Sequence, residues 1–294
     1  MRPRIQPDAP SRSLKHAKRI LWGLAIISVL GMASYFLVPL YIFYYVPEEL
    51  PPYDIPPRAK DDTLRIAIIG DSWAEFHMNL QGDTIFDIIS KRIYDKPLKS
   101  RTRGKGYATS KDIYFYMFDY MTTEHSYEPD RCTQPLIEEH PDYCVIYAGI
   151  NDAILRRPTY YYTGSIRSII RLLLHNGIRP VVMEMPKFSH PGSFNWRPLK
   201  ERAFILVRGL IMGTWYNDVS QYRMALKDML TETGLQDSIL YIPTTKWNPK
   251  GCEDAAIYIE DQVHLNLDGY HILDSCLISE ITKDYSLRNH NTSK

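Results

Sequence analysis

The longest apolar stretch of the chain runs from Ile20 to Val46 and contains no charged residue. A helix rises about 1.5 Å per residue, so about 20 such residues cross the hydrocarbon core of a bilayer. The stretch therefore predicts one transmembrane helix over residues 20–46. A cleaved signal peptide has a shorter apolar region and a small-residue cleavage site, and a core helix of a soluble domain is rarely free of charge over this length.

Basic residues precede this stretch. Residues 1–19 hold one acidic residue, Asp8, against Arg2, Arg4, Arg12, Lys15, Lys18 and Arg19. By the positive-inside rule, this basic tail stays in the cytoplasm and everything after the helix lies on the exported, periplasmic or extracellular, side. Tyrosines follow at the far end of the helix, where an aromatic belt is expected, at Tyr41, Tyr44 and Tyr45.

A proline-rich segment, residues 47–62, separates the predicted helix from the rest of the chain. Proline fixes the backbone φ angle and removes an amide donor, so we expect an extended, semi-rigid linker that lifts the following domain off the membrane. At the other end of the chain, the polar residues 286–294 predict a tail without a fold of its own.

Between these segments, residues 63–285 alternate short apolar runs with helical patterns. The apolar runs typical of buried strands are Leu64–Gly70, Tyr143–Ala148 and Pro180–Met185. Ile239–Ile242 is a short fourth strand, and the polar Lys99–Thr102 is a weaker strand candidate. Helices are predicted over Thr84–Tyr94, Lys111–Tyr120, Tyr160–Asn176, Leu199–Gly213, Asp218–Thr233 and Asn266–Thr282. Such alternation predicts an α/β fold with a parallel sheet and helices on both faces, and the functional site of such a fold lies beyond the carboxyl ends of the strands.

Composition is that of an ordinary globular protein, with 45% apolar and 23% charged residues. The net charge of +1 does not indicate a nucleic-acid partner. Four cysteines occur, at Cys132, Cys144, Cys252 and Cys276, without the spacing of a zinc site. Buried free thiols are the preferred interpretation, although an exported domain also allows one or two disulfides.

Four short motifs carry candidate chemistry, and each has an ordinary structural explanation when taken alone. Gly70-Asp71-Ser72-Trp73 follows the first strand, and Gly149-Ile150-Asn151-Asp152 follows the Tyr143–Ala148 strand. Either motif fits a simple turn. Asp261-Gln262-Val263-His264 precedes the last helix, and Arg103-Gly104-Lys105-Gly106 follows the Lys99–Thr102 strand.

In this order and context the four motifs resemble the SGNH hydrolase family, also called GDSL-like lipases and esterases, over about Leu64 to Thr282. The resemblance implies a three-layer α/β/α fold of flavodoxin-like type, preceded here by the membrane helix. It implies that Ser72 is the nucleophile, that His264 is the base and that Asp261 orients His264. The Ser72 amide, the Gly104 amide and the Asn151 side chain then form the oxyanion hole, with Gly106 as the alternative to Gly104.

The resemblance implies a serine esterase that works through an acyl-serine intermediate, without a metal or an organic cofactor. The expected substrate is an ester, an O-acetyl group above all, on an envelope or extracellular glycan. One alternative is a glycan O-acyltransferase that uses the same serine beside a membrane acyltransferase partner. The other is a non-catalytic, membrane-tethered protein that binds glycans or assists assembly.

The remaining polar and aromatic candidates have no motif partner. Structural or solvated roles are expected for His77, His140, His175, His190 and His271. Asp71 and Asp152 are expected to brace turns, and Trp73 to line the substrate cleft. Tyr160, Tyr161 and Tyr162 suit either sugar stacking or ordinary packing, and packing is preferred.

Overall fold

The computed structural model describes residues 12–44, 49–59, 61–80, 82–118, 132–189, 194–195, 197–211, 214, 218–254 and 256–292. The chain divides into two units, Met1–Pro47 and Glu48–Lys294. In the first unit, helix α1 (Arg12–Tyr44) contains a segment, His16–Tyr35, that is long and apolar enough to span a membrane. The predicted aromatic belt at Tyr41, Tyr44 and Tyr45 falls outside the residues whose side chains are described.

The second unit is built on five parallel strands in the order β2-β1-β3-β4-β5. Their bounds are β1 Leu64–Gly70, β2 Leu98–Gly104, β3 Tyr143–Tyr147, β4 Arg179–Met183 and β5 Leu240–Ile242. The central strands β1 and β3 are almost wholly apolar and buried, as expected for strands covered on both faces.

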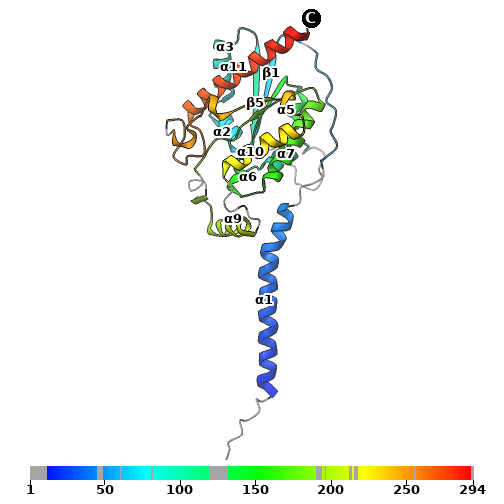
Figure 1. Cartoon of the computed structure of the whole chain (residues 1–294), viewed down its shortest axis with the longest axis vertical. Helices are drawn as coiled ribbons and strands as arrows, with labels where there is room; N and C mark the ends of the chain where they lie inside the picture. The colour runs from blue at the N-terminus through cyan, green and yellow to red at the C-terminus, as the bar shows by residue number, and fades with distance from the viewer. Residues whose placement is uncertain are drawn as a thin grey trace, which may run out of the picture. The chain divides into compact units, whose positions relative to one another are not determined.

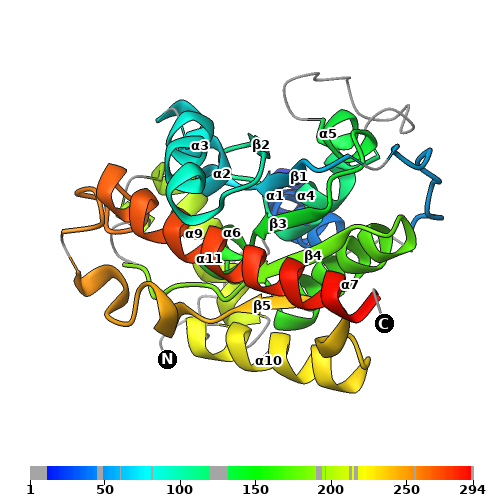
Figure 2. The ribbon, with the colours of Figure 1, turned by 90° about the horizontal axis from the view of Figure 1, so that it is seen from above.

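Helices cover both faces of this sheet (Figures 1 and 2). One layer contains α2 (Ser72–Asn79), α3 (Gly82–Ile93) and α11 (Leu267–Thr292), and the other contains α4 (Ser110–Tyr116), α7 (Thr159–His175) and α10 (Val219–Glu232). Shorter elements complete the unit: α5 Gln134–Glu138, α6 Ile150–Ile154, α9 Leu199–Ile211, and the 3₁₀ turns Gln236–Ser238, Thr244–Lys246 and Gly251–Glu253. The predicted three-layer α/β/α fold is therefore confirmed.

Most predicted elements lie within a few residues of their observed positions, and the differences have local causes. The helix predicted to begin at Lys111 begins at Ser110, because Thr109 and Asp112 form a reciprocal capping box one residue earlier. Asp218 caps α10 in the same way with Gln221. Gly177 has a φ of 69°, as expected for a glycine just beyond the end of α7.

The last helix departs most from expectation, because α11 continues to Thr292 instead of ending near Thr282. Residues beyond Thr282 contact the sheet: Asp284 accepts a hydrogen bond from the Tyr143 hydroxyl (2.7 Å) and pairs with Arg179 (2.8 Å). These tertiary contacts stabilise a helix that its polar sequence does not predict. Most of the expected tail, residues 286–292, is therefore helical.

The proline-rich segment is extended, as predicted, but residues 49–59 lie along the domain instead of forming a free stalk. We call these residues the strap. Its Ile55 is buried and donates its amide to Asn176 Oδ1 (2.8 Å), and the Leu50 amide donates to the Tyr114 hydroxyl (2.8 Å). The Tyr53 ring packs edge-on against Phe118.

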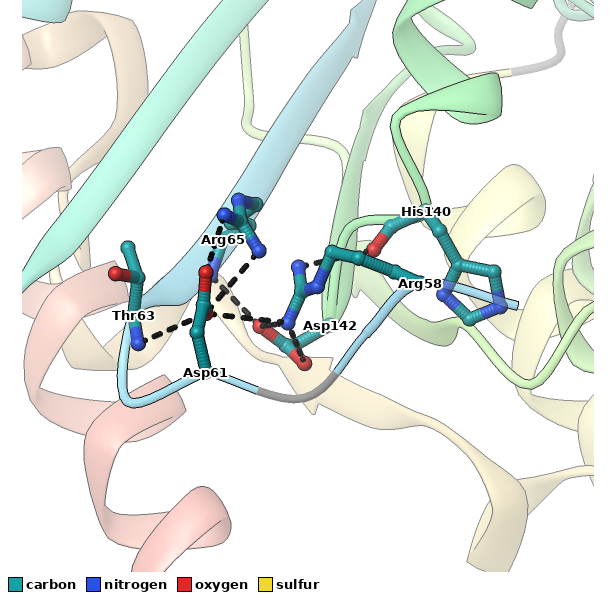
Figure 3. Close-up of polar contacts among 6 residues, drawn as sticks. All are labelled: Arg58, Asp61, Thr63, Arg65, His140 and Asp142. Carbon is teal, nitrogen blue, oxygen red and sulfur yellow. Dashed lines mark hydrogen bonds and ion pairs between the residues drawn. The ribbon is translucent and has the colours of Figure 1, made fainter. Parts of the chain in front are cut away.

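The strap ends in an ion-pair network at the amino ends of β1 and β3 (Figure 3). Asp142 accepts from the Arg58 guanidinium (3.3 Å) and from the Arg65 amide (2.8 Å), while Arg65 pairs with Asp61 (2.6 Å). Arg58 also donates to the backbone oxygen of His140 (3.2 Å). The segment therefore joins the domain at several points before β1 begins.

The four cysteines are free thiols, three of them buried and Cys276 half-buried. Burial raises the pKa of the Cys252 and Cys276 thiols, which keeps both protonated at neutral pH. They pack as small apolar side chains.

Candidate active site

Ser72 is the first residue of α2, directly after a tight turn at the end of β1. The turn needs glycine at position 70, because a Cβ there would lie 2.3 Å from the Tyr147 carbonyl oxygen. The Asp71 amide donates to that same oxygen (3.0 Å), and Asp71 Oδ1 accepts from the Trp73 amide (3.0 Å) and so caps the helix. The predicted bracing role of Asp71 matches this cap.

Ser72, His264 and Asp261 form a hydrogen-bonded series. The Ser72 Oγ lies 2.8 Å from His264 Nε2, and His264 Nδ1 lies 2.5 Å from Asp261 Oδ2. The second oxygen of Asp261 accepts from the backbone amides of Val263 (2.8 Å) and His264 (2.9 Å). These bonds fix the carboxylate, and the carboxylate fixes the orientation of the imidazole.

Asp261 is held as an anion. Partial burial opposes its charge, but the hydrogen bonds from the His264 side chain and from two backbone amides outweigh that cost and lower its pKa. Because the Asp261 carboxylate accepts at His264 Nδ1, it favours the imidazole tautomer that is protonated at Nδ1. Nε2 is then left to accept the proton of Ser72.

Three aromatic residues align the His264 loop with the Ser72 helix, although 190 residues separate the two in sequence. The Trp73 indole N–H donates to the Val263 carbonyl (3.1 Å), and Phe76 stacks on the His264 ring at 4.4 Å between centroids. The Tyr270 hydroxyl donates to the Trp73 carbonyl (2.8 Å). The motifs gave no signal for Phe76 and Tyr270. Trp73, which we expected to line the substrate cleft, is 2% exposed and borders a small cavity.

Asn151 and Asp152 follow β3 on the short helix α6, and both are buried. Asn151 Nδ2 donates to the Ala108 carbonyl (2.9 Å), which fixes the side-chain amide. Asp152 accepts from the Ser110 amide (2.8 Å) and the Ser110 hydroxyl (2.9 Å). Asp152, which we expected to brace a turn, thus braces the start of another helix, α4.

Gly104 ends β2 directly beside Gly70, its register partner in β1. A Cβ on Gly104 would lie within 2.7 Å of the Asp71 carbonyl and 2.4 Å of the Ala74 Cβ, so only glycine allows β2 this close to the start of α2. The Gly106 amide donates to Glu75 Oε2 (2.7 Å). That amide is therefore occupied, which favours Gly104 over Gly106 as the amide next to Ser72.

The strand order explains why these motifs meet. Strands β2, β1 and β3 are neighbours, and each motif begins where one of them ends, so Gly104, Ser72 and Asn151 share the carboxyl edge of the sheet. His264 and Asp261 reach the same edge from the loop before α11.

The neighbours of Ser72 in sequence, Asp71 and Trp73, line a small cavity together with Tyr147, Trp247 and other residues at or just beyond the ends of β3 and β4. Asp71 is 1% exposed, and its Oδ2 has no hydrogen-bond partner among the described residues. Burial raises the pKa of Asp71 to about 7 and that of Asp152 to about 6. The carboxyl group of Asp71, next to Ser72, is therefore easily protonated.

The other histidine and tyrosine candidates occupy structural positions or lie at the surface. His77 is fully buried against Asp274, while His175 pairs with Asp54 of the strap. Tyr161 and Tyr162 are buried, which agrees with packing, whereas Tyr160 is exposed. His190 lies outside the described residues.

No model of a known protein family and no curated protein matches the sequence. Solved structures do match. A Bacteroides fragilis protein described as an acylhydrolase is 19% identical, with 78% of this chain and 91% of that chain covered and a TM-score of 0.50. A GDSL-like lipase from Bacteroides thetaiotaomicron is 17% identical (75% and 88% covered, TM-score 0.49), and an acetylxylan esterase from Geobacillus stearothermophilus is 17% identical (74% and 94% covered, TM-score 0.46). The chain therefore has the same three-layer α/β/α fold as the Bacteroides fragilis protein.

Proposed function

We propose that the chain is a serine ester hydrolase with Ser72 as nucleophile, His264 as general base and Asp261 as the group that orients His264. The observation that carries this proposal is the Ser72–His264–Asp261 series, with contacts of 2.8 Å and 2.5 Å at the carboxyl edge of the sheet. Both distances allow direct proton transfer along hydrogen bonds.

In the first half of the reaction, the Ser72 oxygen attacks the ester carbonyl carbon while His264 Nε2 takes the serine proton. The carbonyl oxygen becomes an oxyanion. When the tetrahedral intermediate collapses, the C–O bond to the alcohol breaks and His264 returns the proton to the leaving oxygen. An acyl-serine remains.

Three donors at the same edge are proposed to stabilise the oxyanion: the amides of Ser72 and Gly104 and the side chain of Asn151. The Ser72 amide belongs to the first turn of α2, where backbone N–H groups lack helical acceptors and favour negative charge. A side-chain amide has two N–H donors, so Asn151 can hold Ala108 with one and offer the other to substrate.

In the second half, His264 deprotonates a water molecule that attacks the acyl-serine, and the proton passes to the Ser72 oxygen as the acid leaves. Replacing water by a glycan hydroxyl in this step gives the acyltransferase alternative. The same residues can catalyse hydrolysis and acyl transfer, and the reaction depends on whether water or a glycan hydroxyl attacks the acyl-serine.

For the substrate, we propose an O-acetyl group on a glycan at a membrane surface. The resemblance to the GDSL-like esterases supports an ester, and the candidate span in α1 suits an enzyme that acts on a polymer close to a membrane. The proposed topology has the N-terminus in the cytoplasm and the domain on the exported side, as the basic N-terminal residues indicate.

The test measures acetate release from p-nitrophenyl acetate and from an acetylated glycan by the full chain in detergent. Ser72→Ala should lower the rate at least about 10³-fold, because the nucleophile is lost. Ser275→Ala, which removes an exposed hydroxyl on α11, is the matched control and should leave the rate unchanged.

The outcomes separate the alternatives. Release that depends on Ser72 establishes the hydrolase. Trapping of Ser72 by a serine-directed phosphonate without release, together with transfer of acetate to an added glycan, would instead assign a transferase. Equal rates for the parent and for Ser72→Ala and His264→Ala would contradict the proposed chemistry and leave a binding role.

A further inference from the structure

Helix α9 presents an apolar face that the described residues of the domain leave exposed. Leu199 is 77% exposed and Leu210 is 73% exposed, Ala203 is exposed, and Leu206 is half-buried. At about 100° per residue these four side chains fall within a stripe about 60° wide on one side of the helix. Single exposed leucines are common, but a continuous stripe along one helix is not.

The opposite side of α9 fastens the helix to the domain. Ile205 and Arg208 are buried, and the Arg208 guanidinium donates to the Leu155 carbonyl (2.9 Å) just after α6. The Thr214 hydroxyl donates to the Arg156 carbonyl (2.9 Å) in the same turn. These contacts fix α9 to the domain, so the apolar stripe has a fixed position on the domain surface.

Basic residues border the stripe. On the helical wheel Lys200 falls about 60° beyond Ala203, with the half-buried Val207 between them, and Arg202 falls about 40° beyond Leu206 on the other side. Besides Arg208, which is buried on the opposite side, residues 197–211 contain three basic residues, Arg197, Lys200 and Arg202. The one acidic residue, Glu201, is paired with Arg197 (3.3 Å). An apolar stripe with cations on both flanks suits acyl chains beneath anionic headgroups.

The chain itself keeps this domain near lipid if α1 is embedded. Residues 45–48 alone separate the end of α1 from Glu49, which is ion-paired with Arg171 (2.9 Å) on α7. At about 3.5 Å per extended residue, this connection spans at most about 17 Å. A lipid surface is therefore a partner that the domain would meet continuously.

We propose that α9 binds the surface of an anionic bilayer, with Leu199, Ala203, Leu206 and Leu210 inserted among the acyl chains and Lys200 and Arg202 at the headgroups. Helix α9 lies beside α6, which carries Asn151 at the carboxyl edge of the sheet (Figure 1). Binding through α9 would hold that edge next to the bilayer. The inference does not depend on the proposed reaction.

The test places an environment-sensitive fluorophore at Leu210→Cys in the full chain, reconstituted in vesicles of phosphatidylcholine and phosphatidylglycerol that contain doxyl-labelled lipid. The matched control is Leu287→Cys, which is 58% exposed on the part of α11 that contacts the amino end of β4. The labelled parent chain corrects for Cys276, which is half-buried.

We expect lipid quenching at position 210 to be at least about twofold stronger than at position 287, as for a helix lying in the interface. Lys200→Gln with Arg202→Gln should weaken that quenching in anionic vesicles and leave it unchanged in neutral vesicles. Equal quenching at the two positions would overturn the proposal. Self-quenching at 210 that rises with the protein-to-lipid ratio, without lipid quenching, would also overturn it and assign the face to a second copy of the chain.

Discussion

Asp71 positions Ser72 but lowers the stability of the folded protein. Its Oδ1 caps α2 and so places Ser72 at the first turn, but its Oδ2 is buried without a partner among the described residues. Burying a carboxylate with unfilled hydrogen-bonding capacity costs free energy. Asp71 therefore positions Ser72 while it lowers the stability of the folded state.

Asp71→Asn should make the protein more stable at alkaline pH. The pKa of Asp71 is raised to about 7 in the folded state, above its unfolded value, so the folded state binds the extra proton and stability falls as pH rises from about 4 to 7. Asparagine keeps an oxygen for the Trp73 amide and removes the charge. We expect a gain on the order of 2–4 kcal/mol at pH 8 that vanishes near pH 4.

Thermal unfolding of the two proteins at pH 5 and pH 8 measures this difference. Asp62→Asn, at an exposed position, is the control and should leave the unfolding temperature unchanged at both pH values. A gain from Asp71→Asn that is equal at both pH values would mean that the charge of Asp71 is not its cause.

Some residues of the candidate site could be predicted from short sequence motifs, and others could not. Ser72, Asp261 and His264 could be predicted because each belongs to a short motif at the end of a strand or before a helix. The Trp73–Val263 bond and the Phe76–His264 stack could not, since they join segments about 190 residues apart and use residue types that occur in any core. The covered position of Trp73 follows from such contacts.

Among the elements, α2 is fixed by a buried histidine as well as by its cap. His77 Nε2 bonds both oxygens of Asp274 on α11 (3.1 and 3.0 Å), and His77 Nδ1 contacts the Thr102 hydroxyl on β2 (3.3 Å). One imidazole thus joins three elements that surround the site. From sequence it was one of five histidines without a motif partner.

His77→Leu should destabilise the fold by about 1.5–3 kcal/mol, because the substitution removes a hydrogen bond of the buried Asp274 carboxyl group. For a domain of this size the loss lowers Tm by roughly 3–10 °C. A double-mutant cycle with Asp274→Leu, followed by tryptophan fluorescence during heating, measures the coupling between the two residues. Additive losses would show that the pair does not act together.

The helices and strands that could be predicted have a local sequence pattern. Those that could not be predicted depend on tertiary contacts. The apolar runs of β1, β3 and β4 are visible because strands buried on both faces need them. The last ten residues of α11 have no apolar pattern, and Tyr143 and Arg179 stabilise them through Asp284. Short helices such as α6 carry too few residues for any periodicity.

At the scale of the whole molecule, the strap decides where the globular unit begins. Its proline-rich sequence is typical of a free linker, because nothing within it indicates a binding partner. The partners lie 64 and 121 residues away, at Tyr114 and Asn176. They provide acceptors for strap amides that a free linker would leave to water.

A fragment that begins at residue 61 should therefore be markedly less stable than one that begins at residue 48. The shorter fragment exposes the surface covered by Ile55 and Tyr53 and leaves the Asn176 side chain without its strap partners. Burial of Ile55 alone contributes about 1.5–3 kcal/mol, so the full loss should amount to several kcal/mol. Ile55→Ala in the longer fragment should reproduce part of it, and Pro51→Ala, at an exposed position, should not. Thermal unfolding of these proteins measures the effect, and equal Tm values for the two fragments would mean that the strap is a tether without a role in the fold.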